Sequence, residues 1–69
     1  MKQLKINEFV EFELQMFRDK CNFSEEELQY FNLKAKHKSN VEIALKMNVS
    51  ESKVSTLAKS VKRKMFKVL

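Results

Sequence analysis

The sequence holds 69 residues with a formal net charge of +5, one cysteine, one histidine, and neither glycine nor proline. A domain this small buries only about 60% of the surface that its unfolded chain exposes, which leaves little room for a deep catalytic pocket. One cysteine and one histidine exclude an internal disulfide and a Cys/His zinc site. No stretch reaches the roughly 20 apolar residues of a membrane span or has the layout of a signal peptide, so we expect a cytoplasmic protein with no membrane partner.

The absence of glycine and proline favours helices joined by turns of serine and asparagine. We predict an all-α fold in which residues 1–69 form one domain of four helices. The first helix is predicted from Asn7, its N-cap, to about Cys21, within an N-terminal amphipathic segment of residues 1–22. Its apolar surface is wide enough to suggest contacts on two sides, and comprises Ile6, Phe9, Val10, Phe12, Leu14, Met16 and Phe17.

The second helix has the clearest start signal in the chain. Ser24 and Glu27 have the spacing of a capping box. In this motif the serine hydroxyl accepts a hydrogen bond from a free backbone amide, and the glutamate accepts one from the amide of the capping residue. Phe23 and Leu28 stand at the two positions of a hydrophobic staple. Leu28, Phe31 and Ala35 continue as an apolar stripe at helical spacing. A helix is therefore predicted directly after Ser24.

Two further caps follow only eleven residues apart. Ser39 and Glu42 repeat the capping-box spacing, and Ser50 can cap again after Asn48, which we expect in the left-handed conformation that often ends a helix. Apolar residues then continue at helical spacing through Val54, Leu57, Ala58, Val61 and Met65. A short helix, a tight turn and a longer helix make a helix-turn-helix layout, so we predict such a unit over residues 23–69 with a recognition helix at about 51–67.

Charge is divided unevenly along the chain. Residues 1–37 hold six Lys/Arg and seven Asp/Glu, a net charge of −1, whereas residues 38–69 hold eight and two, a net charge of +6. Clustered cations are what a polyanion selects, although a solvated lysine-rich face gives the same count. Charge alone does not decide between these two interpretations.

The order of residues after Ser50 favours duplex DNA as the partner. The major groove admits a helix and presents a different donor and acceptor pattern for each base pair. Small, polar and cationic side chains are predicted on the exposed side of the last helix, while its apolar stripe packs. The exposed set is Glu51, Ser52, Lys53, Ser55, Thr56, Lys59, Ser60, Lys62, Arg63 and Lys64. The stretch 51–59 is rich in Ser and Thr and suits base reading, whereas the dense charge of 60–67 suits phosphates.

The run from Phe23 to Met65 resembles the DNA-binding domains of LuxR-type response regulators and region 4 of bacterial sigma factors. The similarity lies in Phe23-Ser24-x-x-Glu27-Leu28, Ser39-Asn40-x-Glu42-Ile43-Ala44, Val49-Ser50, Val54, and Val61-x-x-Lys64-Met65. His37 and Asn48 replace glycines that are frequent in LuxR-type domains, and an aliphatic Leu57 is closer to sigma region 4. The sigma-like module is therefore the favoured relative.

This resemblance implies a role for each of eleven residues. Base-edge contacts would fall to Ser52, Lys53, Ser55, Thr56 and Lys59, and phosphate contacts to Lys38, Ser39, Asn40, Lys46, Lys62 and Arg63. It also implies a transcriptional role, with RNA polymerase as a second partner that sigma region 4 binds. No metal, cofactor or catalytic residue is expected.

Alternatives to DNA binding remain for three features. Residues 59–67 could form a basic helix on an anionic membrane, but their apolar positions continue the core stripe from Val54. Cys21 and His37 lack an orienting acid, so we expect a packing residue and a helix-end or turn residue instead of an enzyme's catalytic pair. The first helix could complete the core, pair with a second copy, or dock on RNA polymerase, in which case the chain is an interaction module. Completion of the core is favoured, because so small a unit needs cover.

Overall fold

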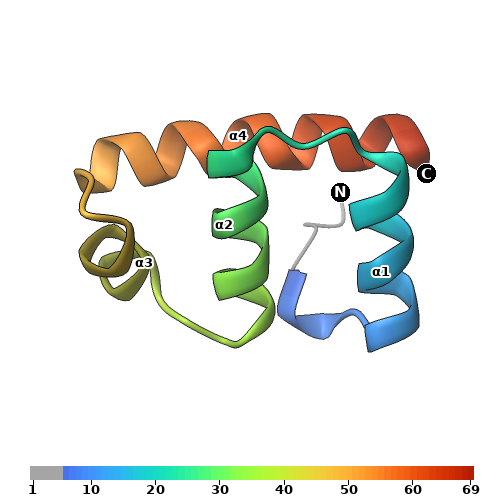
Figure 1. Ribbon diagram of the computed structural model, residues 1–69, viewed down its shortest axis with the longest axis horizontal. Coiled ribbons are helices and arrows are strands. Elements are labelled where there is room, and N and C mark those ends of the chain that lie inside the picture. The colour runs from blue at the N-terminus through green and yellow to red at the C-terminus, as the bar shows by residue number, and fades with distance from the viewer. Residues whose placement is uncertain (1–5) are drawn as a thin grey trace.

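Five helical segments follow one another along residues 6–69, the part of the chain that the computed structural model describes (Figure 1). They are a 3₁₀ turn η1 (Ile6–Glu8) and the α-helices α1 (Glu11–Lys20), α2 (Glu25–Ala35), α3 (Asn40–Met47) and α4 (Glu51–Val68). The prediction of an all-α protein with four helices is thereby confirmed.

The longest helix, α4, organises the others. It runs along one edge of the molecule, while α1 and α2 lie side by side below it, and α3 lies near its first turns, seen nearly end-on (Figure 1). Its buried stripe consists of Val54, Leu57, Val61 and Met65, as the apolar spacing predicts. The core side chains from the other segments are Ile6, Leu14, Phe17, Cys21, Tyr30, Phe31, Ile43 and Ala44.

Serine hydroxyls start three of the four helices, as predicted. The hydroxyl oxygens of Ser24, Ser39 and Ser50 accept hydrogen bonds from the amides three residues later at 3.2, 3.2 and 3.1 Å. Glu27 and Glu42 complete the two capping boxes by accepting from the amides of the capping serines at 2.8 and 3.3 Å. The short connections therefore leave few free amides at these helix starts.

Asn48 and His37 end α3 and α2 with left-handed backbone. Asn48 has φ 57° and ψ 48°, and His37 has φ 67°. A side chain disfavours this region, but asparagine tolerates it better than most residues. The amide of Val49 returns to the carbonyl of Ala44 at 3.0 Å, so the turn after α3 also satisfies a free carbonyl. The predicted conformation of Asn48 is confirmed, and His37 is a turn residue.

The predicted start of the first helix is wrong. Asn7 is not an N-cap but lies in η1, where its side-chain nitrogen Nδ2 is 3.2 Å from His37 Nδ1. Val10 is extended, and α1 begins only at Glu11, with the Val10 amide donating to Glu13 Oε1 at 3.0 Å. Ile6 is buried, so the apolar spacing continues across a bend that spacing cannot reveal. Residues 1–5 of the predicted segment 1–22 lie outside the described residues.

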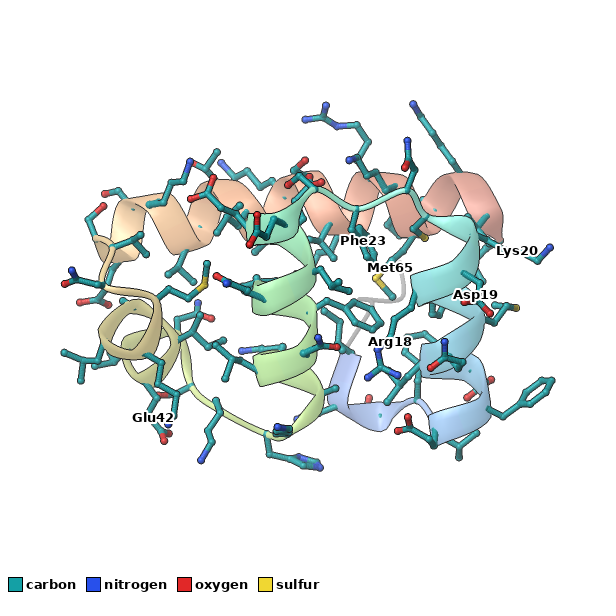
Figure 2. All side chains as sticks on the ribbon, viewed as in Figure 1. Arg18, Asp19, Lys20, Phe23, Glu42 and Met65 are labelled. Atoms are coloured by element: carbon teal, nitrogen blue, oxygen red, sulfur yellow. The ribbon has the colours of Figure 1, made fainter. Side chains whose placement is uncertain are left out.

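Arg18 joins α1 to α2. In Figure 2 its side chain points from α1 toward α2, whereas Lys20 lies on the outer side. The Nε atom donates to Asn32 Oδ1 at 2.9 Å, the guanidinium lies 5.6 Å from the Phe31 ring centroid, and Nη1 pairs with Glu11 at 3.1 Å. The contacts with Asn32 and Phe31 hold α1 against α2, whereas the pair with Glu11 lies within α1.

Several side chains of the predicted apolar surfaces are exposed instead, among them Val10 at 62%. Leu28 is 36% exposed, and the buried side of α2 is formed instead by Glu27, Tyr30 and Phe31. Phe12 is 82% exposed on the side of α1 away from the core.

No helix within residues 6–69 is long and apolar enough to cross a membrane.

Candidate nucleic-acid interface

The outer face of α4, opposite its buried stripe, carries most of the residues predicted to contact DNA. The helix has 18 residues and is therefore about 27 Å long. At 100° per residue, the side away from Val54, Val61 and Met65 is formed by exposed residues, which we call the outer face: Ser52, Ser55, Thr56, Lys59, Lys62, Arg63 and Phe66. Six of the eleven predicted contact residues thus share one continuous surface.

The cations of the outer face have no acidic partner. Lys59, Lys62 and Arg63 form no ion pair with any residue between 6 and 69. Lys59 is three residues from Lys62 and four from Arg63, which places their charges on neighbouring turns of one side. An unbalanced row of cations along one helix face attracts a polyanion.

The first turns of the outer face are small and nearly uncharged. Ser52, Ser55 and Thr56 are exposed, and the Thr56 hydroxyl donates to the Ser52 carbonyl at 3.1 Å. This internal bond occupies the threonine proton and leaves its oxygen able to accept from outside. Short side chains here also allow the helix backbone to approach a ligand closely.

Lys53 lies at the border of this surface. Its ammonium is 3.4 Å from Glu26 Oε1 of α2, and its side chain is half-buried. At helical spacing Lys53 shares a side of α4 with Ser60 and Lys64, which we call the α2 flank. The sequence predicts Lys53 as a base-reading residue, and the structure places it beside an acid on this flank.

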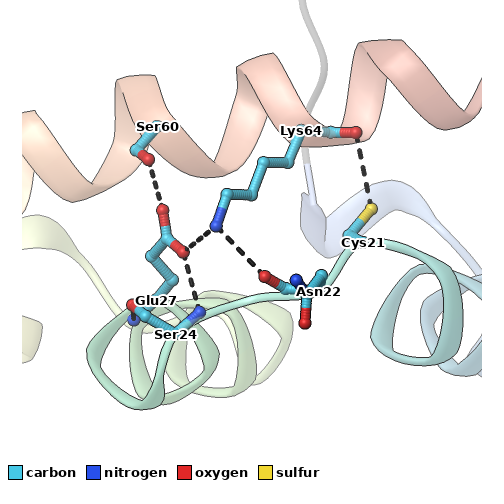
Figure 3. Close-up of polar contacts among 6 residues, drawn as sticks. All are labelled: Cys21, Asn22, Ser24, Glu27, Ser60 and Lys64. Atoms are coloured by element: carbon cyan, nitrogen blue, oxygen red, sulfur yellow. Dashed lines mark hydrogen bonds and ion pairs between the residues drawn. The ribbon is translucent and has the colours of Figure 1, made fainter.

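Glu27 of α2 faces the α2 flank and contacts both Ser60 and Lys64 (Figure 3). One carboxylate oxygen accepts from the Ser24 amide at 2.8 Å and from Lys64 Nζ at 2.5 Å, while the other accepts from the Ser60 hydroxyl. Lys64 Nζ also donates to the Asn22 carbonyl at 3.1 Å. One side chain therefore caps α2 and binds α4 at two positions one turn apart.

The charge of Glu27 is stable inside the fold because these donors outweigh burial. Burial by itself would raise the pKa of the Glu27 carboxyl, but hydrogen bonds from Lys64, the Ser24 amide and Ser60, together with the charge of Lys64, lower the pKa from 4.5 to about 2. Its side chain is 7% exposed. Among residues 6–69, no buried side-chain nitrogen or oxygen lacks a hydrogen-bond partner.

The prediction that Ser60 and Lys64 belong to the exposed side of the last helix is wrong. Both were expected among its exposed residues, whereas both turn toward Glu27. The signal that could have found them is their position directly before Val61 and Met65, at the edge of the apolar stripe. Glu27 was interpreted as a capping residue only, which concealed its second role.

The remaining predicted phosphate contacts lie around α3. Lys38 approaches Glu42 at 4.0 Å, Asn40 Oδ1 accepts from Lys34 at 3.2 Å, and Ser39 caps the helix. Lys46 is exposed near the end of α3 and has no ion pair within residues 6–69. Lys38, Ser39 and Asn40 are therefore held by contacts around the start of α3, separately from the outer face of α4.

Cys21 and His37 occupy unrelated places. The buried Cys21 thiol donates to the Lys64 carbonyl at 3.6 Å, and burial raises its pKa. His37 contacts Asn7 at the turn after α2. Within the described part of the chain, no three His, Cys, Asp or Glu side chains gather as a metal site would require.

Comparisons of the chain with protein families, curated proteins and solved structures find no match.

Proposed function

We propose that the chain binds double-stranded DNA through a helix-turn-helix formed by α3, residues 48–50 and α4, and acts in transcription as a sigma-region-4-like factor or regulator. In such a unit the first helix braces against the DNA backbone and the second enters the major groove. The left-handed Asn48 and the Ser50 cap support this turn, since they allow α4 to begin after only three intervening residues.

The observation that carries the proposal is the separation of charge around α4. The cations that point toward α2 have acidic partners, Lys53 with Glu26 and Lys64 with Glu27. The cations of the outer face have none among the described residues. Lys59, Lys62 and Arg63 therefore lie together on one exposed side of α4 with their charges unbalanced, which makes this side a continuous positive surface.

The outer face also changes along its length in the way that groove binding requires. Ser52, Ser55 and Thr56 can approach base edges with short hydroxyl groups. Lys62 and Arg63 lie roughly 10 Å further along the helix, where a straight helix leaves the groove and meets the phosphates. Lys59 lies between the two groups and can donate to guanine O6 and N7 or to a phosphate.

Selection from a random duplex library tests the proposal. We expect recovery of a shared short sequence, and Thr56→Ala should change the preferred bases more than the total affinity. Recovery of no shared sequence, or unchanged binding after Lys59, Lys62 and Arg63 are all replaced by glutamate, would contradict it.

A pair of single variants separates the outer face from general charge. Lys62→Gln should weaken binding to all duplexes by roughly three- to tenfold and lower the slope of affinity against salt by about 1. Lys36→Gln removes the same charge from the end of α2, which lies away from α4 (Figure 1), and should change affinity less than about twofold. Equal effects of the two variants would mean that the attraction is nonspecific.

A protein-interaction module is the second candidate function, and the exposed Phe12 favours it. In this alternative the helix-turn-helix is a scaffold, and the aromatic α1 docks on RNA polymerase or a regulator. A stoichiometric complex whose affinity is insensitive to salt and sensitive to Phe12→Ala would support it.

A further inference from the structure

The side of α1 that faces away from the core is an unpartnered apolar surface with charges on both flanks. Phe12, 82% exposed, and the half-buried Met16 are four residues apart and neighbour each other on this side. With Gln15, Asp19 and Lys20 they line a hollow of about 250 Å³. Figure 2 shows Asp19 and Lys20 on the outer side of α1, at the edge of the molecule.

The charges beside this surface are complementary between two copies of α1 that lie antiparallel to each other. Glu13 and Lys20 are seven residues apart, two turns along the same side of α1, and neither forms an ion pair within residues 6–69. If a second α1 lies antiparallel across it, Glu13 of each copy meets Lys20 of the other.

We infer that α1 pairs with α1 of a second copy of this chain, antiparallel and related by a two-fold axis near Met16. The axis passes between positions 16 and 17, so that Glu13 lies opposite Lys20 of the second copy. The Phe12 ring then lies near the aliphatic stem of that Lys20, and the two Met16 side chains lie on either side of the axis. The contact is small, because the ten-residue α1 is about 15 Å long. Association is therefore weak and depends on protein concentration.

The antiparallel arrangement has a consequence for DNA that rests on the proposed function. The end of α1 lies beside α4, where Cys21 contacts Lys64, and its start lies away from α4 (Figure 1). Reversing the second copy therefore places the two α4 helices at opposite ends of the α1 pair. The outer faces then point in opposite directions, and the pair bridges two DNA segments instead of reading two half-sites of one.

Sedimentation of the full chain without DNA tests the pairing, over roughly 10 µM to 1 mM. We expect reversible dimerisation of the wild type and a dissociation constant at least about tenfold higher for Phe12→Ser. Leu45→Ser is the matched control, since it removes a 76% exposed apolar side chain from α3 and should leave the constant unchanged. A wild-type monomer at 1 mM, or equal effects of the two variants, would overturn the inference.

Charge reversal tests the orientation. Lys20→Glu should weaken the dimer by roughly fivefold, and adding Glu13→Lys should restore it to within about twofold of the wild type. Circular dichroism verifies that the double variant keeps α1, because Glu13 also accepts from the Val10 amide. If α1 frays, Glu13→Gln keeps that acceptor and should weaken the dimer about twofold. Failure of the double variant to restore a dimer, with α1 intact, would exclude the antiparallel register.

Capture of a labelled duplex by an immobilised duplex tests bridging. Wild-type protein should capture the label above its dimerisation constant, and Phe12→Ser should bind each duplex normally but capture at least about tenfold less. Binding of single duplexes without capture would overturn the bridging inference and leave DNA binding standing. Dimerisation without any DNA binding would instead contradict the proposed function alone.

Discussion

The two sides of α4 that carry cations differ in what surrounds each charge. On the α2 flank, Lys53 and Lys64 face Glu26 and Glu27, and Ser60 donates to the same carboxylate as Lys64. On the outer face, Lys59, Lys62 and Arg63 form no ion pair with any residue between 6 and 69. Lysine on one helix thus has two uses, of which the first fixes the helix in the fold and the second leaves charge for a ligand.

Substitutions on the α2 flank should therefore change the free energy of unfolding, and substitutions on the outer face should change the affinity for DNA. Buried and half-buried pairs lose a partner that water cannot replace well, whereas exposed residues lose little in the folded state. Four experiments, from the largest effect to the smallest, test how sharp this division is.

Replacing Glu27 should have the largest effect. Glu27→Gln keeps the size and one acceptor but leaves the Lys64 ammonium without its anion, so we expect the free energy of unfolding to fall by about 3 kcal/mol. Urea denaturation followed by circular dichroism measures this. The control is Glu25→Gln in the exposed first turn of α2, expected within about 0.5 kcal/mol of the wild type. A loss as small for Glu27 as for Glu25 would show that the contacts of Glu27 with α4 do not stabilise the fold.

Acid should reproduce part of the same loss. Because the folded pKa of Glu27, about 2, lies below the unfolded value of 4.5, its contribution is complete above about pH 5 and disappears as the pH falls through the folded pKa. From pH 5 to pH 3 this group alone removes about 2 kcal/mol. Denaturation curves of the wild type and Glu27→Gln should therefore converge over this range. Parallel curves would show that another carboxylate governs acid stability.

Two serines on the same helix give a smaller, matched contrast. Ser60→Ala removes a hydrogen bond to the buried carboxylate and should cost about 1 kcal/mol. Ser55→Ala removes an exposed hydroxyl from the outer face, so stability should stay within about 0.5 kcal/mol while DNA preference changes. The melting temperatures of the two variants and their binding to a selected duplex decide between these outcomes. If Ser60→Ala changed DNA preference and Ser55→Ala lowered stability, the two sides of α4 would have the opposite roles.

The smallest effect concerns Lys53, at the border between the two sides. Glu26→Gln removes its exposed partner, and we expect affinity for duplex DNA to rise by roughly two- to fivefold at low salt with little change in stability. Fluorescence anisotropy at two salt concentrations measures it, with Glu25→Gln as the control for general charge. A rise no larger than that of the control would place Lys53 outside the contact surface.

Local patterns predicted most of the fold correctly. The serine caps, the glutamates three residues later and the left-handed Asn48 depend on neighbours within four residues, so sequence spacing contains them. The start of α1 failed because Val10 interrupts the helix by its backbone conformation, while the apolar spacing around it continues. A valine carries no signal of that interruption.

The candidate site was predictable only where it depends on one helix. The exposure of Ser52, Ser55 and Thr56 follows from their spacing against the apolar stripe. The contacts of Lys64 with Glu27 and of Lys53 with Glu26 join residues 37 and 27 positions apart, and depend on how α2 crosses α4. Sequence periodicity describes one helix and contains no information about such crossings.

The double use of the Glu27 carboxylate couples two events that are separate in many small proteins. It holds the first turn of α2 through the Ser24 amide and holds α2 against α4 through Lys64 and Ser60. If α2 begins to fray, the bond between the helices is lost with the cap, and undocking of α4 releases the cap in turn. The Ser24 amide should therefore exchange its hydrogen only when the whole domain opens, not with the local fluctuations usual at a helix end.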